Sequence, residues 1–239
     1  MKKRWIAVSA GLFFYAVFLA AMVPATFINP ILAHYGGNNL RVSNAQGTLW
    51  NGSGSLYGLE EIRWKIRLPE LLLGHLHINV ASSIATRAMD IFISPARIEM
   101  QHVALILPAA VLADWAPMLK SLAPGGKLSM VTEKFSASDT FFRGRLELDW
   151  LDATSSLSRV APIGSYRIHL AANGRGLTLQ LDTQKGPLFL AGTGSWSPST
   201  GLRFSGTARS KNEQLAGLLN LIGKPSPSGA YRVLIGGRS

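Results

Sequence analysis

The sequence predicts a mainly β protein: a single N-terminal transmembrane helix followed by a curved antiparallel β-sheet domain with weak two-half internal repetition and a few short helices. Three observations lead to this fold class. An uncharged run of 24 residues follows a short basic start. Several later segments alternate apolar and polar residues with a period of two, which is typical of strands. Glycine and proline separate these segments.

The N-terminal run, residues 5–28, has the length of a membrane anchor. As a helix with a rise of ~1.5 Å per residue it would be ~36 Å long, more than the ~30 Å hydrocarbon core of a bilayer. The basic MKKR before it favours retention in the cytoplasm. Small residues around Ala25 keep a cleaved signal peptide open as an alternative, although the apolar core of such a peptide spans only ~7–15 residues. We expect a cytoplasmic tail (1–4), a transmembrane anchor (5–28), a linker (29–39) and a periplasmic β-rich domain (40–239).

The composition excludes several classes of protein. Charged residues make up only 15% of the chain, against ~25% in typical soluble domains. Cysteine is absent, which excludes a disulfide framework, a thiolate metal site and cysteine catalysis. The net charge is +11 without a dense basic run. In an exported domain, such scattered charge fits anionic lipid headgroups or acidic partner proteins, and no nucleic acid is expected as a partner.

Period-two alternation predicts strands with one apolar and one polar face. It is clearest in residues 61–68 and 142–150, and it recurs in residues 177–182 and 202–207. The apolar positions of the first two segments include Ile62, Trp64, Ile66, Phe142, Leu146, Leu148 and Trp150. This pattern predicts an antiparallel sheet with one face buried and the other exposed to solvent.

Helical segments are expected to be few and short: residues 69–74, residues 108–126 with a break near Pro117, and residues 211–222. For the last helix, Ser210 and Glu213 have the spacing of a capping box. Gly223 can take the left-handed conformation that ends many helices.

A weak internal repeat is the basis for the predicted two-half arrangement. A short helix or turn leads to a glycine and then to a strand at four places, namely Gly74, Gly126, Gly164 and Gly229. The last two are the most similar, since each glycine precedes a small residue, Tyr and Arg. The irregular intervals between the glycines exclude a regular solenoid.

Residues 47–66 combine two tryptophans with four glycines. Glycine inside a strand marks a bulge, strong curvature or the close approach of another backbone. We expect a curved hairpin with its turn at Gly58 and with Trp50 and Trp64 on one apolar face. Two interpretations stay open for that face: a closed core, or an apolar cleft that accepts a lipid tail or a side chain of a partner.

This stretch also carries a family resemblance. After a hydrophobic segment the chain reads Val42, four residues, Gly-Thr-Leu-Trp-Asn-Gly (47–52), one residue and Gly54, and then Ile62, Trp64 and Ile66 at alternate positions. This arrangement resembles protein N of the type II secretion system. The second half fits the same layout at Gly144, Leu146 and Trp150. The motif and the candidate apolar face together comprise Gly47, Trp50, Gly52, Gly54, Ile62, Trp64, Ile66, Phe142, Leu146, Leu148 and Trp150.

The resemblance implies an accessory component of the machinery that exports folded proteins across the outer membrane of Gram-negative bacteria. It further implies a single-pass protein of the inner membrane whose periplasmic C-terminal domain docks partners. Those partners would be other inner-membrane and periplasmic components of the system. The resemblance also implies that the chain is not an enzyme.

The residues themselves show no catalytic or metal site. His75 and His77 share a strand face, but a zinc site needs further ligands, and no acidic residue is placed to help. The Gly-Ser segments at 52–55 and 192–195 lack the spacing of nucleophile or phosphate loops. We therefore expect no enzyme, no metal and no cofactor. The alternative function is an envelope lipid-binding or lipid-transfer module with an apolar groove on a half-open sheet.

Overall fold

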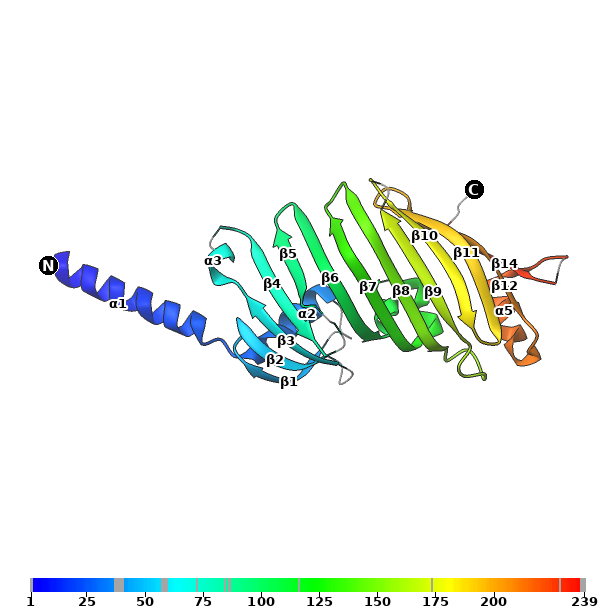
Figure 1. The fold of residues 1–239 in the computed structure, drawn as a ribbon, viewed down its shortest axis with the longest axis horizontal. Coiled ribbons are helices and arrows are strands. Elements are labelled where there is room, and N and C mark those ends of the chain that lie inside the picture. Colours follow the sequence, from blue (N-terminus) through cyan, green and yellow to red (C-terminus); the bar gives the residue numbers. More distant parts are fainter. Residues whose placement is uncertain are drawn as a thin grey trace.

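A 14-stranded antiparallel sheet forms most of the molecule (Figure 1). The computed structural model describes residues 2–36, 41–56, 60–71, 73–83, 85, 87–115, 117–172, 174–227 and 229–236, without the side chains of residues 2–10, 13, 34–36, 60, 115, 117 and 118. Strands β1 to β12 pair in sequence order, β14 pairs with β12, and β13 lies outside β14. The expected mainly β fold with a few short helices is confirmed, and the sheet is open.

Strands β6 to β12 are longer than the strands before and after them. The first seven are β1 (Val42–Gly47), β2 (Asn51–Leu56), β3 (Glu60–Ile66), β4 (Leu76–Ser82), β5 (Met89–Ser94), β6 (Arg97–Pro108) and β7 (Gly125–Ala137). The others are β8 (Phe142–Thr154), β9 (Gly164–Ala172), β10 (Leu177–Lys185), β11 (Leu188–Ser197), β12 (Gly201–Ser210), β13 (Lys224–Pro225) and β14 (Tyr231–Ile235). All four segments with period-two alternation contain strands, but the first is shorter than predicted, because β3 ends at Ile66 and Leu68 begins α3. The predicted turn at Gly58 lies outside the described residues.

The sequence predicts one continuous helix over residues 5–28, but the structure interrupts it. Helix α1 (Lys2–Ala21) ends before Pro24, and the 3-10 helix η1 (Ala25–Phe27) and helix α2 (Ile28–Gly36) follow. Pro24 has no backbone N–H with which to continue the helical hydrogen bonds. Among the helices of the described residues, none combines the length and the apolar character needed to cross a membrane. The side chains at positions 2–10 and 13 of α1 lie outside the described set.

Helix α2 occupies most of residues 29–39, where the sequence predicts a linker; residues 37–40 lie outside the described residues. The segment is docked on the sheet rather than extended. The side-chain amide of Asn29 donates to the carbonyl oxygen of Val42 at 3.0 Å and accepts from its N–H at 2.9 Å. Ala25 is buried in the first core cluster, and Leu32 packs against it. The domain boundaries remain predictions.

The remaining helices are short, as predicted. They are α3 (Leu68–Leu71), α4 (Val111–Trp115) with the 3-10 helix η2 (Pro117–Leu122) directly after it, and the 3-10 helix η3 (Glu213–Leu215) leading into α5 (Ala216–Ile222). The change of helix type at Pro117 matches the predicted break, because proline cannot donate the hydrogen bond that would continue α4.

The predicted ends of the last helix are wrong in two details. The capping side chain belongs to Asn212, whose Oδ1 accepts from the N–H of Gln214 at 3.0 Å. The Ser210 hydroxyl instead donates to the carbonyl oxygen of Pro187 and accepts from the N–H of Asn212. Gly223 is extended, with φ −152°. A Cβ there would stand 2.9 Å from the carbonyl oxygen of Arg232, so close approach to β14 explains the glycine.

Two hydrophobic clusters cover the inner face of the sheet. The first lies under η1, α2 and α4, and its buried members are Ala25, Val42, Leu56, Ile62, Trp64, Leu107, Ala109, Val111, Leu112, Leu128 and Leu148. The second includes residues of η3 and α5, and its buried members are Ala153, Ile163, Tyr166, Leu188, Ala208, Leu215, Leu218, Leu219 and Val233. Trp150 packs against both. The core thus has two parts, whereas the internal sequence repeat remains a prediction.

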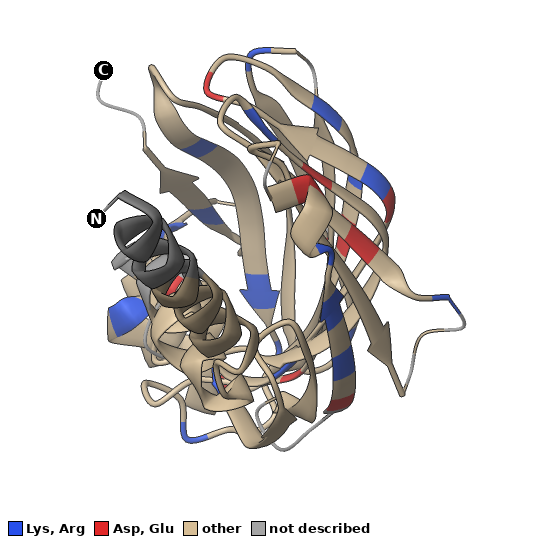
Figure 2. Cartoon of the chain, turned by 90° about the vertical axis from the view of Figure 1, so that its left-hand side faces the viewer, with Lys and Arg blue, Asp and Glu red and all other residues tan. Residues whose placement is uncertain are grey.

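The outer face of the sheet carries the charged positions of the alternating strands. Figure 2, which views the molecule from the α1 end, shows the sheet as a curved wall with acidic and basic residues spread along its strands. Arg167 on β9 forms two hydrogen bonds with Asp149 on β8, at 2.7 and 3.0 Å, and lies 3.2 Å from Glu147. These hydrogen bonds raise the pKa of Arg167, with a further contribution from the charges of both carboxylates.

Candidate functional site

Trp64 is at the centre of the first core cluster. It lies on β3, is only 2% exposed, and pairs with Gly52 across the β2–β3 hairpin. Its six-membered ring fills the space in which a Cβ of Gly52 would stand. The indole nitrogen donates to the carbonyl oxygen of Leu49 at 2.9 Å. Gly52 thus provides the space for the ring, and the carbonyl of Leu49 satisfies its buried donor.

The other glycines of the motif also permit close approach. A Cβ on Gly54 would meet the Val42 side chain and would lie 2.9 Å from the carbonyl oxygen of Ser43. Gly47 has φ +88°, a backbone conformation that residues with side chains rarely adopt. β1 therefore lies tightly against β2 at the edge of the sheet, and the glycines of residues 47–54 serve backbone packing.

Trp50 has a different role from Trp64, because it joins the sheet to α1. Its indole nitrogen donates to the carbonyl oxygen of Ala20 at 2.7 Å. In a continuous α-helix this carbonyl would accept from residue 24, which is Pro24 and has no N–H. The Leu49 N–H donates to the carbonyl oxygen of Val23 at 2.8 Å, and Pro24 forms a β-bridge with Thr48. We call these contacts the α1–sheet junction.

The remaining residues of the predicted apolar face lie in different surroundings. Ile62 and Leu148 are buried in the first cluster, and three others are partly buried against it, namely Ile66, Leu146 and Trp150. Phe142 lies at the far end of β8 and makes an edge-to-face contact with Trp196 at 5.5 Å. The structure therefore brings most of these residues together in one packed interior. Trp50 lies at the α1–sheet junction, and Phe142 lies outside this interior, at the start of β8.

A polar network on the outer face was not predicted as a unit. His77 is buried, its Nε2 lies 2.8 Å from Asp90 and its Nδ1 lies 3.4 Å from Glu70 of α3, and its ring stacks on Phe92. Burial favours the protonated form of Asp90, but hydrogen bonds from Asn79 and His77 outweigh this effect and lower the pKa of the carboxyl group. His75 and His77 belong to no cluster that could hold a metal ion within the part of the chain that the structure describes.

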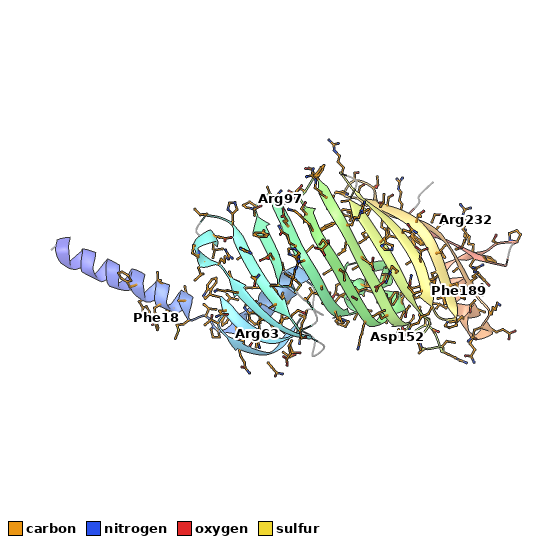
Figure 3. All side chains as sticks on the ribbon, in the orientation of Figure 1. Phe18, Arg63, Arg97, Asp152, Phe189 and Arg232 are labelled. Carbon is orange, nitrogen blue, oxygen red and sulfur yellow. The ribbon has the colours of Figure 1, made fainter. Side chains whose placement is uncertain are left out.

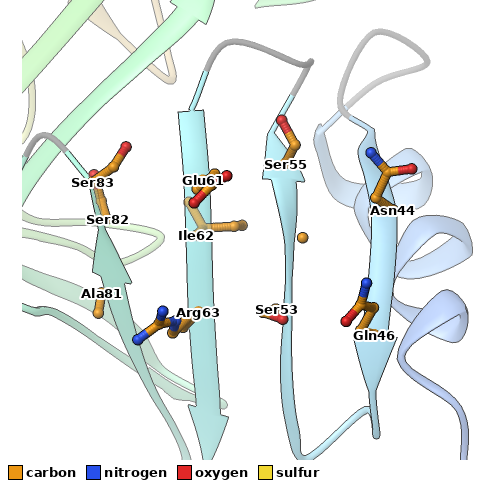
Figure 4. A pocket seen from close by; sticks show the side chains of 11 residues that line it. Asn44, Gln46, Ser53, Ser55, Glu61, Ile62, Arg63, Ala81, Ser82 and Ser83 are labelled. Atoms are coloured by element: carbon orange, nitrogen blue, oxygen red, sulfur yellow. The ribbon is translucent and has the colours of Figure 1, made fainter.

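A shallow polar hollow of about 580 Å³ lies on the outer face of β1 to β4 (Figure 4). Hydroxyl and amide groups line most of it, and Glu61 and Arg63 stand on the β3 strand between them. Both charged residues are exposed. Such a lining can form hydrogen bonds with a polar partner, but it contains no histidine or cysteine and no aromatic ring.

The two edges of the sheet differ. The β1 edge is partly covered by Asn29, whose amide supplies the hydrogen-bonding partner of Val42. On the β14 edge, the described partner strand β13 has only two residues. The charge also changes toward this edge, since residues 183–239 contain seven Lys and Arg residues and a single acidic residue, Glu213.

Five exposed residues share the outer face near the β14 edge. The register pairs Phe189 of β11 with Arg209 of β12, and it pairs Leu234 of β14 with Ser205 of β12. Because alternate residues of a strand share a face, these side chains lie on one side of the sheet. We call the exposed set the β14-edge surface: Phe189, Arg203, Arg209, Arg232 and Leu234. Figure 3 labels Phe189 and Arg232 at this end of the molecule.

The comparison with protein families decides the identity of the chain. The family model described as Type II secretion system (T2SS), protein N, matches residues 38–234. The chain belongs to this family. A search of curated proteins and a search of solved structures each found no match. The matched range includes all of the sheet except Ile235 at the end of β14, and the resemblance seen in the motif at residues 42–66 is confirmed.

Membership in the protein N family connects the chain to type II secretion, and hence to the cell envelope and to other components of that system. Sequence reasoning missed two residues of structural importance here. Pro30 could have indicated the start of a helix near Asn29, because proline is common in the first turn of a helix, but the hydrogen bonds of Asn29 to Val42 had no local signal. The contact of Trp50 with Ala20 had no signal in the local pattern.

Proposed function

We propose that this protein N-family chain is an accessory component of type II secretion that holds partner components at the inner membrane. In this proposal the N-terminal segment anchors the chain, the sheet lies in the periplasm, and no chemical step is catalysed. The observation that carries the proposal is the family match over residues 38–234, which covers the sheet and not the N-terminal helix. The uncharged residues 5–28 support the anchor.

The β14-edge surface is the proposed docking site. Phe189 and Leu234 are exposed apolar residues, and the guanidinium group of Arg209 lies 5.7 Å from the ring of Phe189. Arg203 and Leu234 also line a hollow of about 460 Å³. Cationic and apolar groups on one surface complement an acidic partner segment that carries apolar side chains. Residues 183–239 carry more basic than acidic residues. Two copies of this edge would therefore repel each other, which disfavours a second copy of the chain as the partner.

Secretion assays in a strain that lacks the gene can test the docking site. We expect Arg232→Glu to restore less secretion than the unchanged chain, because it reverses a charge in the docking surface. Arg175→Glu, in the exposed turn before β10, is the charge-matched control and should restore normal secretion. Equal thermal stability of both variants would show that folding is not the cause. Normal secretion with Arg232→Glu would overturn this docking site.

Cross-linking gives an independent measurement, because the chain has no native cysteine. A single cysteine at Leu234 should cross-link to a type II secretion component in cells, and a cysteine at the exposed Val131 of β7 should not. Cross-linking at both positions, or at neither, would contradict docking at the β14 edge.

A lipid-binding module is the second candidate function. It is favoured by the inner face of β10, where Leu177, Leu179 and Leu181 are half-buried and belong to neither core cluster. Trp196 on the neighbouring β11 is 37% exposed. If this face binds lipid tails, a photoactivatable phospholipid should label the full chain, and Leu179→Arg should abolish the labelling. Unchanged labelling of Leu179→Arg would exclude a groove at this place.

A further inference from the structure

The exposed apolar residues are concentrated at one end of the molecule. Among the described residues, 21 large hydrophobic side chains are exposed, and 12 of them lie either between residues 12 and 31 or in and next to α3. Figure 1 shows α3 at the end of the sheet that faces α1. These two segments are separated in the sequence, but both lie at the same end of the molecule.

The α3 segment presents its leucines outward. Leu68, Leu71 and Leu73 are 40%, 42% and 76% exposed. The backbone of the tip is fixed, because the N–H groups of residues 73 and 75 donate to the carbonyl oxygen of Glu70 at 3.0 Å. None of the three leucines belongs to the two core clusters. The two core clusters therefore do not account for them, and exposed apolar residues that are grouped at one place mark an interaction surface.

The α1–sheet junction fixes where this tip lies relative to α1. The Trp50 indole holds the last turn of α1, and the Leu49 N–H holds Val23. Asn29 then fastens the start of α2 to the edge of β1. Three attachments on either side of Pro24 restrict rotation of α1 about its end. If α1 crosses a membrane, the α3 end of the sheet faces the surface from which α1 emerges.

Basic residues lie on the β3 side of the α3 tip, where Arg67 also forms an ion pair with Glu70 of α3 at 3.5 Å. Arg67 directly precedes α3 and its side chain is 59% exposed, and Arg63 and Lys65 are exposed on the adjoining β3. Figure 3 labels Arg63 on the same end of the sheet, below α3 in that view. Exposed leucines next to Lys and Arg are the combination that binds the interface of a membrane with anionic lipids, since the apolar groups enter the headgroup layer and the cations attract phosphate.

We propose that the α3 tip, formed by Leu68, Leu71 and Leu73, lies in the headgroup layer of the membrane that α1 anchors. This inference rests on the anchoring role stated under the proposed function. It adds a second contact, which together with the α1–sheet junction sets the orientation of the sheet relative to the membrane. The occupant of the patch is the lipid surface itself.

Fluorescence quenching in reconstituted full-length chain tests the proposal. Single cysteines are introduced at Leu73, at Phe18 of α1 and at Leu234 of β14, and each is labelled with an environment-sensitive dye. The vesicles contain phosphatidylethanolamine, phosphatidylglycerol and a lipid with a nitroxide on its headgroup or its acyl chain. We expect the dye at position 73 to shift to the blue and to lose intensity with headgroup nitroxide. The dye at position 234 should show neither change.

Dyes at different positions test the membrane contact of α3 separately from the anchoring of α1. Quenching by acyl-chain nitroxide at position 18 without any quenching at position 73 would overturn the α3 contact and leave the anchor intact. Absence of quenching at both positions would overturn the anchor, and with it the basis of the inference. Quenching at position 73 that is equal to that at position 234 would show general adsorption and would also overturn the inference. Because Leu73 is mostly exposed, its replacement leaves the core unchanged, and circular dichroism can verify the fold.

Discussion

The indole ring of Trp64 lies against Gly52, its partner on the neighbouring strand, and occupies the space of the side chain that Gly52 lacks. The contact couples the two halves of the β2–β3 hairpin to the first core cluster. It also explains why a glycine stands inside a strand, where glycine normally weakens the structure.

Replacement of Gly52 by alanine should destabilise the chain by ~1–3 kcal/mol, which is typical of overpacking in a filled core. The new Cβ would collide with the Trp64 ring and stand 2.8 Å from the carbonyl oxygen of Gln46. Denaturant unfolding followed by circular dichroism measures the loss. Gly217→Ala in α5 is the control, because nothing lies within 4 Å of a Cβ there. Equal stability of the two variants would contradict the contact.

The two tryptophans of residues 47–66 should respond differently to substitution. Trp64→Ala should cost ~3–5 kcal/mol, because it empties a buried site. Trp50→Phe should cost only ~0.5–1.5 kcal/mol, because it removes one hydrogen bond to Ala20. The loosened α1–sheet junction should also be cleaved faster by protease near residues 21–25, with the sheet left intact. If Trp50→Phe leaves the cleavage rate unchanged, the indole bond does not restrain this segment.

Loss of the Asn29 side chain should open the β1 edge. Asn29→Ala removes both hydrogen bonds to Val42 and leaves polar groups of a buried residue without partners, at a cost of ~1–3 kcal/mol. Hydrogen exchange of the Val42 amide should become faster in this variant. Asn29→Asp keeps an acceptor for that amide and should protect it better than alanine does. Unchanged exchange in Asn29→Ala would mean that the edge is held by other contacts.

Asn212, and not Ser210, should be the cap of the last helix. Asn212→Ala should destabilise the chain by ~0.5–2 kcal/mol, as usual for a lost N-cap, and Asn212→Asp should retain most of the stability, because it keeps the acceptor for Gln214. Thermal unfolding of the three proteins provides the comparison. If Asn212→Ala unfolds at the same temperature as the unchanged chain, the hydrogen bond makes no net contribution to stability.

Acid should weaken the fold through Asp90 and Glu99. Hydrogen bonds from Lys134 and Gln101 lower the pKa of Glu99, and those from Asn79 and His77 lower the pKa of Asp90. A carboxyl group whose pKa is lowered by folding stabilises the fold above its unfolded pKa, ~4 for both residues. This contribution is lost as the pH falls through the folded value. The melting temperature should therefore fall below about pH 4, and less steeply in the Asp90→Asn, Glu99→Gln double variant. The same slope in both proteins would exclude these two groups as the cause.

Strands and their faces could be predicted because side chains alternate along a strand. Ile62, Trp64 and Leu148 were placed on the apolar side from period two alone, and all three are buried. The break at Pro117 followed from the chemistry of proline. The cap was misplaced because Ser210 and Asn212 both have capping side chains, and the choice depends on the carbonyl of Pro187, which is 23 residues away in sequence.

The sequence by itself determined the mainly β class, the short helices, the apolar face and, through the motif at residues 42–66, the protein N family. Only the tertiary structure decided that the sheet stays open, that Trp64 lies on Gly52 while Trp50 holds α1, and that the charged and apolar residues of the β14 edge share one surface. The physical reason is that periodicity reports which side of a strand is apolar, whereas strand pairing and long-range hydrogen bonds decide what that side meets.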